Sequence, residues 1–140
     1  MEQPHPHLRK TLPRMNKTAH VDPTAFIDHN RKVIIKPWVC ICAGVKIHGH
    51  YHIHNLEYQT RVYKMNLGLR AVWGANELFI GHHTWICEGA VILPQVDYIA
   101  PYTIIGANTV VTKNIKEPCR VVVGNPGRIV RKHDYDKVVR

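Results

Sequence analysis

The chain contains few of the residues that cross-link a protein. Its 140 residues include four cysteines, namely Cys40, Cys42, Cys87 and Cys119. Cys40 and Cys42 lie too close in sequence for an easy disulfide between strands, and no other spacing indicates a pair. The simplest expectation is that the thiols are reduced, as they are in proteins of the cytoplasm.

Long apolar segments are also absent from the sequence. No stretch approaches the roughly 20 apolar residues that a membrane-spanning helix needs. The first 20 residues, MEQPHPHLRKTLPRMNKTAH, are polar, basic and interrupted by proline, and they lack the apolar core of a secretory signal. We therefore expect no membrane span, a cytoplasmic location, and a basic lead-in over residues 1–20 before the folded part.

Acidic residues are outnumbered by basic ones. Lysine and arginine together number 19 against 10 aspartates and glutamates, which gives a formal net charge of +9. Basic residues crowd the segment 113–140, and a basic surface favours phosphates, nucleotides, nucleic acids or acidic glycans as partners. A non-catalytic scaffold that binds nucleic acid is one interpretation of this charge. However, no aromatic residues alternate with the basic ones as base stacking requires, so we expect no nucleic-acid partner.

What the chain does contain is a repeat of six residues. β-Branched residues make up much of its apolar content, which favours strands. Isoleucine or valine recurs in one phase, with one extra residue near Tyr98, at Ile80, Ile86, Ile92, Ile99, Ile105 and Val111. These anchors continue upstream at Ile35, Ile41, Ile47 and Ile53 and, offset by two residues, at Val21 and Ile27. The residue four positions after an anchor is usually small or β-branched, as at Thr84, Ala90, Val96, Thr103 and Thr109.

The repeat excludes two common folds. Six is not a multiple of the roughly 3.6 residues of a helical turn, and glycine and proline accompany the β-branched residues. A β-sandwich would instead show hairpin signals about every 8–12 residues. Six-residue phasing predicts an all-β parallel β-helix, a solenoid with three short strands per coil. Each anchor and its i+4 neighbour are expected to lie inside.

The repeat is interrupted once. After Ile53 the period is lost, and it resumes at Ile80, so residues 53–79 are expected to leave the coil as a long excursion loop. Long irregular loops in compact domains are commonly functional. The side chains of this loop are ordinary sugar-binding types that carry no readable code for one ligand, and they include Tyr58, Tyr63, Lys64 and Trp73.

Four histidines alternate at the start of this loop, in the segment VKIHGHYHIHN at residues 45–55. Side chains alternate along a strand, so the residues on either side of an anchor face outward. His48, His52 and His54 are then expected to face outward and His50 to lie at a corner, which keeps all four out of the core. A metal site, a general base and a histidine-rich surface strand all remain consistent with this placement.

The segment after the last repeat is the most specific motif. It reads IIGANTVVTKNIKEPCRVVVGNPGRIVRK and spans residues 104–132. It resembles the ending of the hexapeptide-repeat acyltransferases, in which a V-V-T-K step leads through a proline loop to a G-N-P-x-R-x-(I/V)-R finish. Repeats and ending together cover residues 21–132, which leaves residues 133–140 as a short C-terminal tail. The resemblance implies that the parallel β-helix is left-handed, against the usual handedness of parallel crossovers.

The family members that this chain most resembles are acetyl-CoA-dependent O-acetyltransferases of sugars. They carry a histidine five residues past an anchor, directly before a long loop, and His52 stands five residues past Ile47. The resemblance implies that His52 is a general base, which deprotonates an acceptor hydroxyl as it attacks the thioester directly. His50 and His54 are the second choices, because Ile53 stands where many relatives have proline.

The resemblance also implies a donor site for acetyl-CoA as co-substrate. Trp85 is expected to border the reacting centre, and Gly106 and Ala107 to line the pantetheine arm. The phosphates are expected to contact Lys113, Arg128 and Arg131. Relatives form homotrimers with active sites between subunits, so we expect a homotrimer. Cys87 and Glu88 replace the glycine and small residue of many relatives. The acceptor, whether a sugar, a nucleotide sugar, a polysaccharide, an amine or a drug, is not readable.

A metalloenzyme is the rival function. The γ-class carbonic anhydrases share the fold and bind a metal through histidines that include a His-x4-His pair. The positions five after His82 and His83 are Cys87 and Glu88, so this pair is absent from the right phase. We therefore expect no functional metal, although alternating histidines are able to capture zinc.

Overall fold

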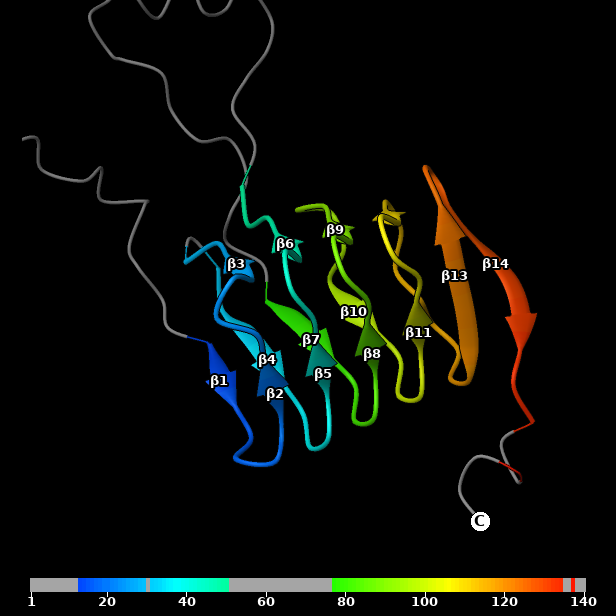
Figure 1. Cartoon of the computed structure of the whole chain (residues 1–140), viewed down its shortest axis with the longest axis horizontal. Helices are drawn as coiled ribbons and strands as arrows, with labels where there is room; N and C mark the ends of the chain where they lie inside the picture. Colours follow the sequence, from blue (N-terminus) through cyan, green and yellow to red (C-terminus); the bar gives the residue numbers. More distant parts are fainter. Residues whose placement is uncertain (1–12, 30, 51–76, 135–136, 138–140) are drawn as a thin grey trace, which may run out of the picture.

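The described residues form a solenoid of short β-strands (Figure 1). The computed structural model describes residues 13–29, 31–50, 77–134 and 137. Within these residues the strands pair in parallel, apart from one antiparallel hairpin at the C-terminal end. No helix of this described part is long and apolar enough to cross a bilayer. The prediction of an all-β parallel β-helix is confirmed.

Three sheets form the sides of the coil, and from β1 to β12 successive strands along the chain belong to successive sheets. Sheet A has the order β1 (Arg14–Met15), β4 (Val33–Ile35), β7 (Leu78–Ile80) and β10 (Tyr98–Ile99). Sheet B has the order β2 (His20–Val21), β5 (Cys40–Ile41), β8 (Trp85–Ile86), β11 (Ile104–Ile105), β13 (Arg120–Gly124) and β14 (Gly127–Lys132). Sheet C has the order β3 (Phe26–Ile27), β6 (Lys46–Ile47), β9 (Val91–Ile92) and β12 (Val110–Val111).

The anchors of the six-residue repeat fill the inside of the coil. In sheet B, for example, Ile41, Ile86 and Ile105 lie in register on neighbouring strands. The described anchors from Ile35 to Val111 are at most 2% exposed. The i+4 positions are as deeply buried, so each short strand contributes one anchor and each corner one small or β-branched side chain to a continuous core.

Strand pairing already begins within residues 1–20, because β1 pairs with β4. In the same first coil, Val21 of β2 lies beside Ile41 and Ile27 of β3 lies beside Ile47, both in the next coil. The upstream repeat is therefore in register with the rest. Val21 and Ile27 are only partly buried, since they belong to the first coil of the described part. The two-residue offset of the repeat falls between Ile27 and Ile35, where it enlarges one corner.

Two corners of the coil hold left-handed backbone conformations. One has φ of 57–72° at residues that tolerate it, namely Gly44, Gly89 and Asn108. The other has φ of 57–62° at residues that rarely adopt it, namely Trp38, His83, Tyr102 and Cys119. At the second corner the backbone N–H of His83 donates to Pro37 O and that of Tyr102 to His82 O, each at 3.0 Å. Hydrogen bonds between coils therefore impose the conformation on these side chains.

Candidate functional site

The histidine segment begins where β6 ends. His48 and His50 lie within the described residues, whereas His52 and His54 fall in the segment 51–76 outside them. The ring of His48 lies 6.0 Å from that of Phe26, an exposed residue of sheet C, so His48 faces outward. The expected general base itself is therefore not placed, and its role stays a prediction.

His50 is held by a buried carboxylate. Asp28, which is 5% exposed, has its Oδ2 2.5 Å from His50 Nδ1 and also accepts the backbone N–H of Gly49 at 2.9 Å. An ionised carboxylate only accepts hydrogen bonds, so an ionised Asp28 requires that Nδ1 of His50 is the donor. The His50 side chain is 24% exposed. This geometry is what a general base needs, and sequence periodicity did not reveal Asp28.

Arg31 completes this corner. It is 2% exposed, and its Nη1 donates to Pro94 O at 3.0 Å and to Val96 O at 2.7 Å. A Cβ at Gly49 would lie 3.1 Å from Arg31 Cγ and 3.2 Å from Asp28 Cγ, so only glycine fits easily between the two charged side chains. The two-residue offset after Ile27 is the sequence signal for this polar corner, because it marks the place where extra residues enter the coil.

Trp85 lies on the outer face of sheet B beside two thiols. Its side chain is 50% exposed, as expected for a residue before an anchor, and its Nε1 donates to Cys42 Sγ at 3.1 Å. Cys42 follows the partner strand β5, and Cys87 follows β8 at the matching position. Burial raises the pKa of the Cys40 and Cys87 thiols above the ordinary value, which keeps both protonated at neutral pH.

The expected pantetheine contacts lie at the corner between β11 and β12. Ala107 is exposed, and Gly106 is partly buried against β13. A Cβ at Gly106 would come within 2.7 Å of Val123 Cγ1, so glycine is required for the close approach of the C-terminal hairpin. Lys113 is exposed just after β12. Their contacts with a cofactor stay predictions.

Arg128 and Arg131 lie three residues apart on β14, and a regular strand would direct them to opposite faces. The hairpin contains a register shift between Val121 and Val122, so Val123 pairs with Arg128 and Val121 with Arg131. Directly opposed residues of an antiparallel pair share a face. The bulge therefore brings both arginines to the face opposite that of Val122, which is 3% exposed in the core.

A metal centre has no support within the described ranges. Among residues 13–29, 31–50, 77–134 and 137, no group of three or more histidine, cysteine, aspartate or glutamate side chains is arranged to hold a metal ion. His82 and His83 approach each other, with 3.0 Å between their Nδ1 atoms, but they pack against the ring of Tyr102 instead of a third ligand.

The known proteins whose sequences resemble part of this chain include proteins named as acetyltransferases. One relative is a Staphylococcus aureus (strain COL) protein that is named as an acetyltransferase. It is 44% identical over 62 residues, which cover 44% of this chain and 30% of that protein. A chloramphenicol acetyltransferase of Agrobacterium fabrum (strain C58) is 36% identical over 62 residues, 44% of this chain and 29% of its own length. The match thus spans less than a third of these relatives. No protein-family model matches the sequence.

Comparison with solved structures covers most of the chain. A maltose O-acetyltransferase from Clostridium difficile 630 has a TM-score of 0.64 and 26% identity over 89% of this chain and 70% of its own. A polysialic acid O-acetyltransferase has a TM-score of 0.63 and 22% identity over 86% and 53% of the two chains. A galactoside acetyltransferase, solved in complex with coenzyme A, has a TM-score of 0.58 and 22% identity over 86% and 65%. The fold is the left-handed parallel β-helix of these proteins, and the resemblance to the hexapeptide-repeat acetyltransferases is confirmed.

Proposed function

We propose that this protein is an acetyltransferase that moves an acetyl group from acetyl-CoA to a hydroxyl of a sugar or a sugar-containing acceptor. The similarity to the maltose O-acetyltransferase, at 26% identity over 89% of the chain, supports the reaction and the class of acceptor. Neighbouring structures that contain coenzyme A or acetyl-CoA support the donor. The observation in the chain itself that carries the proposal is the pair of arginines that the β-bulge brings to one face of β14.

The donor would bind along one side of the coil. Arg128, Arg131 and Lys113 supply cations for the phosphates of coenzyme A, since guanidinium groups bind phosphate with two parallel hydrogen bonds. The pantetheine arm would follow the corner at Gly106 and Ala107, where the Ala107 side chain is small and exposed. Trp85, exposed on sheet B, would border the thioester.

The chemistry needs one general base. His52 would accept the proton of the acceptor hydroxyl while that oxygen attacks the thioester carbonyl carbon. The tetrahedral intermediate then collapses, the C–S bond breaks, and the sulfur of coenzyme A leaves and takes up a proton. No metal and no covalent intermediate on the protein are required. His50 and His54 are the alternatives, and the contact of His50 with Asp28, which orients the imidazole ring, supports His50.

The melting temperature of the full chain, measured with and without coenzyme A, tests the donor site first. At a hundredfold excess over the dissociation constant, mass action predicts a stabilisation of about 2–3 kcal/mol. A variant with both Arg128→Gln and Arg131→Gln is expected to lose most of this effect. Lys132→Gln, a neighbouring change on the same strand, is the matched control and is expected to retain it.

The same samples then test the base. With a sugar that accepts acetyl, His52→Ala is expected to keep the coenzyme A effect and to lose about 10²–10⁴-fold in turnover. His50→Ala and His54→Ala, assayed in parallel, identify the base if His52 is not the residue. If coenzyme A stabilises none of the proteins while zinc stabilises wild type and not His52→Ala, the acetyltransferase proposal is wrong and the histidines form a metal site.

A further inference from the structure

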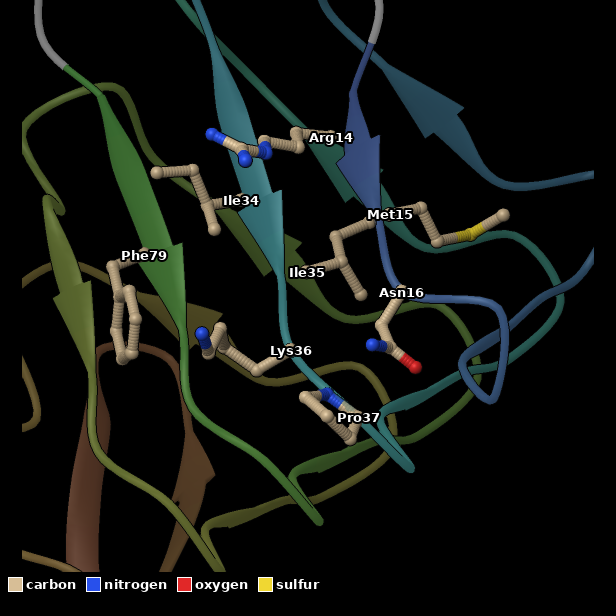
Figure 2. Close-up of a pocket in the computed structure, with 8 residues that line it drawn as sticks. All are labelled: Arg14, Met15, Asn16, Ile34, Ile35, Lys36, Pro37 and Phe79. Atoms are coloured by element: carbon tan, nitrogen blue, oxygen red, sulfur yellow. The ribbon is translucent and has the colours of Figure 1, made fainter.

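A pocket lies on the outer face of sheet A, away from the residues assigned to the donor. Its volume is about 470 Å³, within the range of small-molecule sites. Figure 2 shows the side chains around it, which come from β1, β4, β7 and the turns after β1 and β4: Arg14, Met15, Asn16, Ile34, Ile35, Lys36, Pro37 and Phe79. The donor residues lie on sheet B and at the corners of sheet C, so the pocket belongs to a different side of the coil.

The polar groups of this pocket are hydrogen-bond donors. Arg14 and Lys36 carry positive charge, and no acidic side chain lines the pocket. Among the described residues, neither of them has an ion pair with an aspartate or glutamate. Asn16 uses its Oδ1 to accept from the N–H and the hydroxyl of Thr18, at 3.0 and 2.7 Å, so its amide NH₂ is the group left for a ligand.

The rest of the lining is apolar. Ile34 lies between the two cations, with Arg14 on one side and Lys36 on the other in Figure 2. Lys36 Nζ stands 5.9 Å from the centroid of the Phe79 ring. That ring stacks on Tyr98 at 5.2 Å with an interplanar angle of 6°, which fixes its orientation. Two cations therefore flank an apolar surface that is held in place by a second aromatic ring.

We propose that this pocket binds a small organic anion. Its carboxylate or phosphate group lies between Arg14 and Lys36 and accepts from both, with the Asn16 amide as a third donor. Its apolar body, of the size of one ring, covers Ile34 and the edge of Phe79. A site whose charged side chains are both cations favours an anion, because a neutral ligand leaves the two charges uncompensated. This second site goes beyond the proposed acetyl transfer and is independent of it.

Isothermal titration of the full chain tests the site with phenyl phosphate and benzoate as probes, and with benzyl alcohol as the uncharged counterpart. Both anions are expected to bind at low salt and to bind more weakly at high salt, since the cations are partly exposed. Arg14→Gln and Lys36→Met are each expected to lower the affinity at least about tenfold. Lys46→Met removes an exposed lysine from sheet C and is expected to change nothing.

Three results would overturn the proposal. The first is no binding of either anion, or equal affinity for benzyl alcohol. The second is an equal loss of affinity in Lys46→Met, which would reduce the effect to overall charge. The third is displacement of the probes by coenzyme A in a protein that keeps Arg128 and Arg131, which would make the pocket part of the donor site. The melting temperatures of the variants without ligand show whether each is folded. Lys36→Met is expected to bind coenzyme A as wild type does, which distinguishes failure of the pocket from failure of the proposed acetyl transfer.

Discussion

At the scale of single residues, the second corner of the coil shows local preference overridden by tertiary contacts. Trp38, His83 and Tyr102 adopt left-handed conformations that cost on the order of 1 kcal/mol each. Hydrogen bonds from one coil to the next and ring contacts offset this cost, with His83 and Tyr102 stacked at 4.8 Å. Bulky residues at such positions place aromatic and imidazole rings on an outer edge of the solenoid.

His82, next to this corner, leads to a prediction for how the stability of the fold depends on pH. Burial lowers its pKa below the ordinary value of 6.5, and the charges of His83 and Lys36 act in the same direction. The folded state therefore binds fewer protons than the unfolded state once the pH falls below about 6.5, so this contribution to stability is present above that pH and is lost as the pH falls. We expect the melting temperature to drop between about pH 7.5 and about pH 5.5, and to drop less in His82→Gln.

Thermal unfolding of the two proteins across this pH range checks the prediction. The measured quantity is the difference between the two pH dependences, since the other histidines are common to both proteins. The same pH dependence in wild type and His82→Gln would show that the environment of His82 does not disfavour its protonation.

At the scale of elements, Arg31 links two turns that lie far apart in the sequence. β6 ends at Ile47 and β7 begins only at Leu78, whereas the other neighbouring strands are joined by short turns. Arg31, in the turn before β4, reaches the carbonyls of Pro94 and Val96 in the turn after β9. One buried side chain thus links the turns that follow β3 and β9, the two strands on either side of β6 in sheet C.

Arg31→Met is the direct test of this link. The change keeps most of the side-chain volume but leaves the carbonyls of Pro94 and Val96 without these donors, at an expected cost of about 2–4 kcal/mol in the free energy of unfolding. Arg31→Lys keeps one charged donor and is expected to cost less. Denaturant titration of both variants measures the difference. A cost below about 0.5 kcal/mol for Arg31→Met, the range typical of surface changes, would contradict a bridging role.

At the scale of the whole molecule, a solenoid leaves outer faces and coil ends that a single chain does not cover. Phe26, Trp38 and Trp85 are each at least 50% exposed, and Ile129 and Val130 on β14 are 59% exposed. Adjacent exposed apolar side chains, such as Ile129 and Val130, are the kind of patch at which partner contacts occur, whereas single exposed ones are ordinary. Together with the trimers that the family resemblance implies, they favour assembly into a homotrimer.

Light scattering after size-exclusion chromatography tests this assembly. We expect a mass of three times the 16.1 kDa of the chain. Ile129→Asp with Val130→Asp introduces charge on the exposed strand β14 and is expected to shift the protein toward monomer if that strand lies in the interface. A monomeric wild type would contradict the trimer, and with it the expectation that active sites lie between subunits.

The sequence by itself determined the architecture of the solenoid. A buried anchor every six residues is a local and repeated signal, since each coil must place an apolar side chain inside, and this predicted the β-helix and the phase from Ile35 to Val111. The break in the period after Ile53 predicted an excursion over residues 53–79, which lies outside the described residues apart from its last three and stays a prediction; Leu78 and Phe79 already belong to β7. The exposure of Trp85 followed from the alternation of side chains along a strand.

Only the tertiary structure decided which side chains meet across the coils. The contact of Asp28 with His50, the bridge from Arg31, and the shared face of Arg128 and Arg131 depend on corners and a bulge that shift the chain by one or two residues. Such shifts leave the six-residue period elsewhere unchanged and reverse the direction of a side chain locally. The repeat determines the fold because it recurs in every coil, whereas the site depends on single departures from the repeat, whose geometry is set by neighbours far away in sequence.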